Sequence, residues 1–402
     1  MHINEIIKTK GNNLKKEDLS NVRFYGIDII QYALLGLSLK AEDNLNYKDI
    51  IYTNLTDVLL PKDSNIFQKI QHKSLEYVYL PNQDYSKYNF NNVVLRNCIF
   101  TANSKIPTNS MFFQMIKDKD ISNSMLPSGD YSKYNFNNVL IKGLQLNKDS
   151  ILPNTSDFPQ KLKEKNICKL TLYNGNYEKW NLKDVNAEYV FWGNNIILPK
   201  DKLAFRKLKN SSIKGCTFVN KDLSIYDFKD VNIENCTFIK CKLPNYDWLL
   251  NIAKKSLEGC VFVDCNLENY DFSGVYIGKA KFLGASKLPN DLNVFQKIYN
   301  KDLENTVLPY GDYSKYKFVD VKMAYCKIPY NSKLPNDYDM FSKLKSNDYM
   351  ALTSNVIKKI HLYDLSGLTI NLTKYGKHLT DAQKSIIYQK NKVKITNKEI
   401  IL

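Results

Sequence analysis

Large apolar residues recur at every fifth position through most of the chain. One uninterrupted series is Leu75, Leu80, Tyr85, Phe90 and Leu95. A helix repeats every 3.6 residues and a strand every two, so neither element alone produces this period. The spacing predicts a backbone that turns a corner after each group of five residues and points one large side chain inward from each side. Four such sides would close a coil, and successive coils would stack at the strand spacing of about 4.8 Å.

A longer repeat contains the short one. The segment DYSKYNFNNV occurs at 84–93 and again at 130–139, an offset of 46 residues, and weaker copies begin at 176, 222, 266 and 312. Roughly two thirds of each module follows the five-residue period, which is enough for one and a half coils. The remainder opens with a Leu-Pro or Ile-Pro pair and carries an F-x-K-I-like motif, whose apolar residues three apart predict a short helical turn. We therefore expect two coils per module, with the apolar pair of each insert filling the core.

The inward positions define a candidate core. Its large members are represented by Leu75, Tyr85, Phe90, Tyr131, Phe136, Phe228, Phe272 and Phe318. Seven of the eight cysteines lie two residues before a large inward residue, where a small side chain is expected, and only Cys168 does not. Cys236 and Cys241 are five apart, unlike the C-x2-C spacing of zinc sites. We expect reduced thiols that pack in the core, and hence a reducing compartment.

The repeating unit resembles the A-(D/N)-L-x-x unit of the pentapeptide-repeat family, with matches such as Asn266-Leu267 and Asp271-Phe272. The resemblance covers roughly residues 17–375. It implies an all-β solenoid, specifically a right-handed quadrilateral β-helix, here with short helical inserts once per two coils and with terminal caps.

The two ends of the chain depart from the repeat, and solenoid ends need caps. We expect residues 1–16 to form an N-terminal cap, 17–375 to form the β-helix of about seven modules, and 376–402 to form a C-terminal cap. A helix is predicted after Thr380, a favourable N-cap residue.

No catalytic, cofactor or metal motif is recognisable. The sequence has neither a phosphate-binding glycine loop nor H-E-x-x-H. The four histidines are expected on the surface, at His2, His72, His361 and His378. Asp130 and Asp312 precede large inward residues, where we expect them to bond the turning backbone rather than act as paired acids. The chain is therefore predicted not to be an enzyme.

An aromatic column recurs two residues before one inward position per module. Its members are Tyr88, Tyr134, Trp180, Tyr226, Tyr270 and Tyr316. Exposed aromatic side chains among lysines could stack on nucleic-acid bases. The phase of this column points inward, however, so we expect these residues to fill the core.

The formal net charge of +16 favours anionic partners. Lysines recur in the inserts and form the candidate partner-binding set: Lys69, Lys117, Lys161, Lys163, Lys207, Lys209, Lys297, Lys343 and Lys345. An ordinary solvated face is the alternative interpretation. If the set binds nucleic acid, several phosphate contacts should form together and affinity should fall steeply with salt.

The leading functional hypothesis is a non-enzymatic scaffold whose extended rod surface binds another protein. Direct binding of nucleic acid or anionic membrane through the lysines is the alternative. The family resemblance adds a topoisomerase- or gyrase-interacting protein and a bacterial effector, although the DNA-mimicking members are acidic and this chain is basic.

Location and assembly follow from weaker signals. No apolar run approaches the roughly 20 residues that span a bilayer, and no secretory signal is visible. We expect a soluble cytoplasmic protein, with export without a cleaved signal left open. A dimer through the C-terminal cap is also left open.

Overall fold

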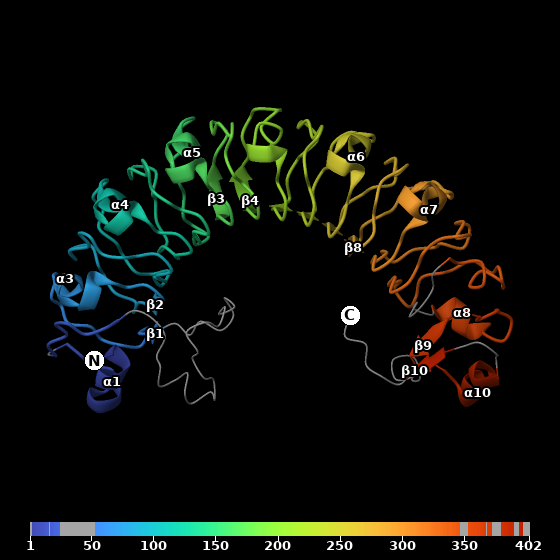
Figure 1. Ribbon diagram of the computed structural model, residues 1–402, viewed down its shortest axis with the longest axis horizontal. Helices are drawn as coiled ribbons and strands as arrows, with labels where there is room; N and C mark the ends of the chain where they lie inside the picture. The colour runs from blue at the N-terminus through green and yellow to red at the C-terminus, as the bar shows by residue number, and fades with distance from the viewer. Residues whose placement is uncertain are drawn as a thin grey trace. The chain divides into compact units, whose positions relative to one another are not determined.

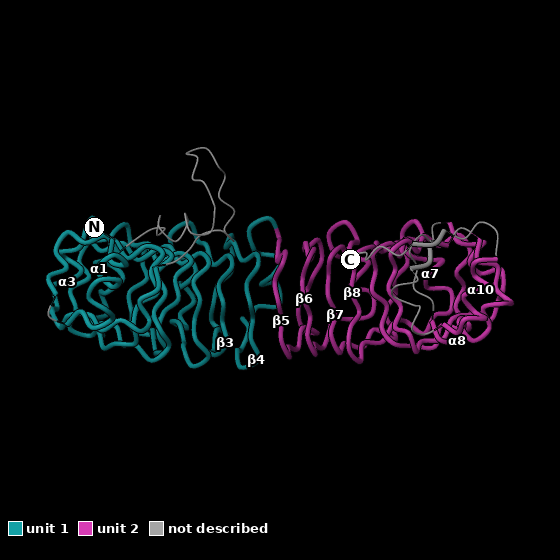
Figure 2. The backbone as a smooth tube through the Cα atoms, turned by 90° about the horizontal axis from the view of Figure 1, so that it is seen from below, with its two compact units in different colours: residues 1–210 teal, residues 211–402 magenta. Residues whose placement is uncertain are grey.

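The computed structural model describes residues 2–15, 17–24, 53–345, 353–366, 368–371, 379–389 and 394–396. The chain divides into two compact units, residues 1–210 and 211–402. They are coloured teal and magenta in Figure 2. The same coil construction is found in each unit.

Successive coils pair in parallel at a register that alternates between two lengths. Tyr79 pairs with Ile99, 20 residues later, and Ile99 pairs with Met125, 26 residues later. The same alternation occurs in unit 2, where Lys281 pairs with Val307 and Val307 with Lys327. A short and a long coil together account for 46 residues. The prediction of two coils per module is therefore confirmed, and the long coil is the one that contains the insert.

Short parallel strands form where the ladder is most regular. In unit 1 they are β1 (Thr53–Asn54), β2 (Val78–Tyr79), β3 (Thr171–Asn176) and β4 (Phe191–Ile197), with β1 paired to β2 and β3 to β4. In unit 2 they are β5 (Thr217–Val219), β6 (Thr237–Ile239), β7 (Val261–Val263) and β8 (Lys281–Leu283), paired in sequence order. Near the C-terminus, β9 (Thr369–Asn371) pairs in parallel with β10 (Lys394–Thr396). The β-solenoid expected from the sequence is thus present as parallel coil-to-coil pairing.

The inserts contain the predicted helical turns. Four-residue helices are α3 (Ile66–Lys69), α4 (Phe112–Met115), α5 (Phe158–Lys161), α6 (Trp248–Asn251) and α7 (Val294–Lys297). The 3-10 turns that follow inserts are η2 (Gln71–Lys73), η3 (Lys117–Lys119), η4 (Lys163–Lys165), η5 (Lys209–Ser211), η6 (Ala253–Lys255) and η7 (Tyr299–Lys301). In unit 1, α3, α4 and α5 lie on the side of the coils opposite β1–β4, and in unit 2, α6 and α7 lie opposite β8 (Figure 1).

Three further helices lie toward the ends. They are α1 (Ile3–Lys10), α8 (Ser354–Lys358) and α10 (Asp381–Gln389). The amide of Gln383 donates to Thr380 Oγ1, and the Gln383 side chain accepts from the Thr380 amide, which forms a reciprocal N-terminal cap on α10. The assignment of residues 1–16 and 376–402 as caps stays a proposal.

The large inward residues are buried. All eight representatives named above are at most 4% exposed. Leu19 and Phe24, which begin the same series, are buried as well, whereas its expected members Ile29, Leu34 and Leu39 lie outside the described residues. In unit 2 the rows stack face to face. The rings of Phe238 and Phe262 are 5.2 Å apart and tilted by only 17°.

Each insert fills the core where a coil side is missing. Phe67 and Ile70 of the first insert are buried, and the Phe67 ring lies 5.5 Å from that of Tyr88 and 5.1 Å from that of Phe90. The equivalent pairs are Phe113/Ile116, Phe158/Leu162, Phe205/Leu208, Leu249/Ile252 and Phe295/Ile298, all buried. The predicted plugging role of the inserts is confirmed for these pairs.

The aromatic column lies against the inserts and bonds to them. The Tyr134 hydroxyl donates to the Pro107 carbonyl at 2.9 Å, and the Trp180 indole N–H donates to that of Pro153 at 2.8 Å. Tyr88, Tyr270 and Tyr316 repeat this bond with Pro61, Pro244 and Pro289. Tyr88, Trp180 and Tyr226 are buried, and the other three members are half-buried. The column therefore fills the core and ties each insert to the coil that follows it.

A glutamine completes this attachment. Gln68 Nε2 donates to the carbonyls of Asn89 and Asn91, at 3.1 and 2.9 Å. Gln114, Gln160 and Gln296 make the same two bonds in their own modules. Because both carbonyls belong to the next coil, the glutamine fixes the insert against it.

The second inward row donates hydrogen bonds to the backbone of the preceding coil. Cys236 Sγ lies 3.0 Å from the carbonyl oxygen of Ile213, and Thr306 Oγ1 lies 3.0 Å from that of Ile277. All eight cysteines are free and buried, including Cys168. Burial raises the pKa of Cys260 to about 12, so this thiol stays protonated at neutral pH.

Short polar residues hold the corners. Asp130 and Asp312 accept hydrogen bonds from the amides of Ser132 and Ser314, at 2.8 and 3.0 Å, as expected for turn residues. Asn92, Asn138 and Asp320 occupy the left-handed region with φ of 55°, 57° and 57°. Asn and Asp tolerate this conformation better than most residues, which gives a structural reason for the many Asn residues.

One surface prediction is wrong. His2 is buried, and its Nδ1 accepts the Asn4 amide at 3.2 Å, so it caps α1. His72 and His361 are exposed, and His378 lies outside the described residues.

The core assignment predicts a large effect of truncating Phe228. This ring is 3% exposed and lies 5.2 Å from that of Trp248. We expect Phe228→Ala to lower the free energy of unfolding by about 3–5 kcal/mol, measured by urea unfolding. Ile225→Ala removes a neighbouring side chain that is 52% exposed, and should have little effect. Equal small effects of the two changes would contradict this core assignment.

Lys221 occupies an inward position that normally holds a small residue. It is 6% exposed, and burial lowers its pKa to about 8. An unfolded lysine titrates near 10.4, so at neutral pH the folded protein holds a charge that burial disfavours. We expect Lys221→Met to stabilise the protein by on the order of 1–2 kcal/mol at pH 7.

The pH dependence supplies the check. As pH rises from about 8 toward 10, folded Lys221 loses its proton before the unfolded chain does, so the wild type gains stability from this group. The stability gap between Lys221→Met and the wild type should therefore narrow over that window. A gap that stays constant from pH 7 to 10 would show that the buried charge is not its cause.

Candidate interaction surface

The candidate interaction surface consists of the exposed side chains of the inserts, taken separately in each unit. We use the term insert surface for the exposed residues of segments 61–73, 107–119, 153–165 and 199–210 in unit 1, and of 244–255, 289–301 and 335–345 in unit 2. This surface includes all nine lysines of the candidate set. Eight of them are exposed, and Lys163 is half-buried.

Most of these lysines are already paired within their own insert. Lys69 Nζ lies 2.6 Å from Asp63 Oδ2, and Lys207 and Lys297 repeat this distance with Asp201 and Asp291. Lys161 pairs with Asp157. Lys343 contacts two carboxylates, at 3.3 Å from Asp337 and 2.7 Å from Asp339. Five of the nine charges are thus neutralised locally.

The titration behaviour of the carboxyls agrees with this pairing. The hydrogen bond from Lys69 holds the pKa of Asp63 below its usual value, and Lys207 does the same for Asp201. Asp63 and Asp291 raise the pKa of Lys69 and Lys297 in turn. These groups are exposed, so the pairs stabilise the fold little and are screened by salt.

The remaining four lysines of the set are Lys117, Lys163, Lys209 and Lys345. They make no ion pair within the part of the chain that the structure describes. Within the candidate set, ion pairs therefore neutralise five of the nine positive charges and leave four unpaired.

Large apolar side chains are also exposed on the inserts, and Leu203, Leu292, Tyr299 and Tyr338 lie in inserts that contain these ion pairs. In unit 1 they are Met111, Met115 and Leu203, and in unit 2 they are Tyr246, Leu292, Tyr299 and Tyr338. Tyr246 and Tyr299 are the most open, at 63% and 54% exposed. Apolar and aromatic side chains beside neutralised charge are the composition expected of a protein-binding patch.

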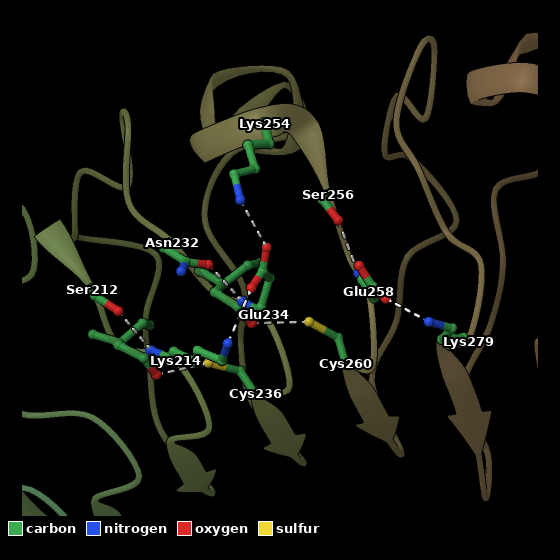
Figure 3. Close-up of polar contacts among 12 residues, drawn as sticks. Ser212, Lys214, Asn232, Glu234, Cys236, Lys254, Ser256, Glu258, Cys260 and Lys279 are labelled. Carbon is green, nitrogen blue, oxygen red and sulfur yellow. Dashed lines mark hydrogen bonds and ion pairs between the residues drawn. The ribbon is translucent and has the colours of Figure 1, made fainter. Parts of the chain in front are cut away.

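A different charge arrangement occurs on the flank of the unit 2 coils. Figure 3 shows Glu234 between two lysines, with its carboxylate oxygens 3.4 Å from Lys214 Nζ and 3.4 Å from Lys254 Nζ. One coil later, Glu258 lies 2.7 Å from Lys279. These ladders link neighbouring coils, so this flank also carries paired rather than free charge.

A candidate metal site and a membrane-spanning helix are both absent from the described residues. Among them, no group of three or more His, Cys, Asp or Glu side chains is arranged to hold a metal ion. Within the same residues, no helix has the length and apolar character needed to cross a bilayer.

Two features of the insert surface could have been found from the sequence. Asp63, Asp201, Asp291 and Asp337 each precede a lysine of the set by six residues. This regular spacing signals an internal ion pair, but the lysines alone were considered. Exposed apolar residues also recur with the module, because Tyr246, Leu292 and Tyr338 lie 46 residues apart and Met111 and Leu203 lie 92 residues apart.

Comparisons with known proteins found distant structural similarities. No protein-family model and no curated protein matches the chain. Among solved structures it is similar to HetL, described as a pentapeptide repeat protein involved in heterocyst differentiation regulation in the cyanobacterium Nostoc. The identity is 13%, the TM-score is 0.17, and the match covers 77% of this chain and 96% of HetL.

A second similar structure is QnrB1, described as a plasmid-mediated fluoroquinolone resistance protein. Here the identity is 16%, the TM-score is 0.24, and the match covers 50% of this chain and 85% of QnrB1. At such values neither protein informs the function of this chain. The five-residue coil sides and the parallel ladder are the construction that the resemblance of the sequence to pentapeptide-repeat proteins implies.

The pairing of the lysines predicts weak nucleic-acid binding. Changing Lys207, Lys209, Lys343 and Lys345 to Gln removes two paired and two free lysines. We expect the logarithm of affinity for labelled duplex to change its slope against the logarithm of salt concentration by at most about two phosphate contacts, or roughly 0.9 each. A loss of about four contacts, with the fold intact by thermal unfolding, would instead support a phosphate-binding face.

Proposed function

We propose that this chain is a non-enzymatic interaction protein whose insert surface binds a protein partner. The observation that carries the proposal is the exposure of large apolar side chains beside lysines that are already neutralised by aspartates of the same insert. Nucleic acid would contact mainly the lysines that remain unpaired, whereas a protein partner would also cover the apolar groups.

The form of the scaffold belongs to the same proposal. We infer a right-handed, four-sided β-helix, with residues 1–16 and 376–402 capping the module series. Such a scaffold holds its inserts at fixed intervals along one side of each unit. A partner could then contact several inserts together, which is how repeat proteins commonly bind.

The exposed leucines of the inserts provide the test. Leu203 and Leu292 are 39% and 41% exposed and lie in inserts of unit 1 and unit 2. We expect the double variant Leu203→Ser/Leu292→Ser to lose at least about tenfold in affinity for the partner, because apolar anchors dominate such interfaces. The partner would first be identified by crosslinking in native lysate, and its affinity then measured with purified proteins.

A matched control separates this role from general surface hydrophobicity. Ile197 of β4 and Leu283 of β8 are 52% and 37% exposed, but they lie on strands and not on inserts. The variant Ile197→Ser/Leu283→Ser should keep wild-type affinity. Equal losses in the two variants, or a loss only in the strand variant, would refute the assignment of the insert surface.

A further inference from the structure

A cleft at the first insert differs in charge from the rest of the insert surface. It has a volume of about 710 Å³ and lies in unit 1, between the start of the insert and the coil side that contains Tyr88. Lys15, Lys62 and Lys87 line it, and Asp84 is the acidic residue of its described lining. The volume is within the range of small-molecule sites, about 300–1,000 Å³.

The register of the coils places two of these lysines opposite each other. Asn13 pairs with Leu59 in the same way that Asn176 pairs with Ile197, and Ile197 follows Leu59 by three 46-residue modules. Lys15 and Lys62 therefore stand where Glu178 and Lys200 stand in the later coil. Glu178 and Lys200 form an ion pair at 2.7 Å. At the first insert the same two positions hold like charges.

Like charges at facing positions repel each other, and only Asp84, whose pKa Lys87 helps to lower, offsets part of the charge in the described lining. Lys15, Lys62 and Lys87 make no ion pair within the described ranges, in contrast to Lys69 of the same insert. The carboxylate of Asp84 accepts the Ser86 amide at 2.9 Å, so it is engaged by its own turn. An anion bound between the lysines would remove the repulsion.

Lys62 and Lys87 occur together only in the first module, as the equivalent positions of the later modules show. The position of Lys62 is taken in later inserts by Thr108, Asn154, Lys200, Asn245, Asn290 and Asn336. The position of Lys87 is taken by Lys133, Lys179, Ile225, Asn269 and Lys315. Lysine occurs at both positions of one module only in the first, so the positive cleft is a local departure from the repeat.

The remaining lining residues of the cleft combine hydroxyl groups with apolar surface, which suits a ligand that has both an anionic and an apolar part. Ser64 and Ser86 contribute hydroxyl groups, while Leu59 and Tyr88 provide apolar surface. Leu59 is 48% exposed, and the Tyr88 hydroxyl donates to the Pro61 carbonyl at 3.1 Å, which leaves its ring as a fixed wall. We propose that this cleft binds a small phosphorylated organic molecule, with Lys15, Lys62 and Lys87 holding the phosphate. This site shares Lys62 and Ser64 with the insert surface, but it contains none of the exposed apolar insert residues on which the proposed function rests.

Isothermal titration of the full chain with phenyl phosphate, pyrophosphate, benzoate and phenol tests the proposal. We expect phenyl phosphate to bind best, pyrophosphate and benzoate more weakly, and phenol not to bind. Binding of benzoate equal to that of phenyl phosphate would replace the phosphate assignment with a carboxylate one. Absence of binding by phenyl phosphate at millimolar concentration would overturn the proposal.

The Glu178–Lys200 ion pair suggests a variant that should weaken ligand binding without destabilising the fold. Lys15→Glu recreates the Glu178–Lys200 arrangement, so it should lower the affinity for phenyl phosphate by at least about tenfold without lowering the thermal unfolding temperature. Lys133→Gln changes the equivalent of Lys87 in the next module and should leave the affinity within about twofold. Equal losses in the two variants would indicate general charge attraction and would refute the site. Partner binding by the insert surface should be unchanged in Lys15→Glu.

Discussion

The parallel hydrogen bonds between successive coils constrain the whole molecule. Each coil must present its amides and carbonyls at the same height and corner as its neighbours, because an unpaired backbone group in the stack is costly. A side that held more than five residues would put every later side chain out of its row. The chain satisfies this condition by placing most extra residues in the insert, where the pairing step lengthens from 20 to 26 residues, or to 24 between β6 and β7, and then returns. The inward rows consequently stay aligned.

Where the insert replaces a regular coil side, the core would lose packing and backbone hydrogen bonds, and residues of the insert restore both. A missing coil side would leave a void and several unsatisfied carbonyls. Phe67 and Ile70 fill the void, while Gln68 and Tyr88 satisfy carbonyls on either side of it. These four residues act together, since the aromatic residue at position 88 is large enough to reach the insert only because no regular coil side is present there. The same solution recurs in other modules, which explains why a bulky residue replaces the usual small one.

Much of the fold is predictable from the sequence because its signals are periodic. The five-residue spacing gave the inward rows, and the 46-residue offset gave two coils per module. The failures concern a residue without a repeat to expose it and a charge pattern whose partners were not included. His2 was expected on the surface, yet its side chain caps α1 and is covered there. The insert lysines were predicted as a basic face because charge was counted without its partners, and Asp63 shows why the count misled.

The attachment of the inserts has a consequence for recognition. A loop that becomes ordered only on binding loses conformational entropy at that moment, which weakens the complex. In this chain the glutamine clamp and the bond from the aromatic residue to the proline carbonyl fix the loop backbone beforehand. Side chains such as Met111 and Leu292 are therefore displayed from preorganised positions, while their identity is free to vary. The coils and their inward rows must stay regular, whereas the exposed side chains of the inserts can change. A new specificity would therefore require substitutions at the insert tips and none in the core.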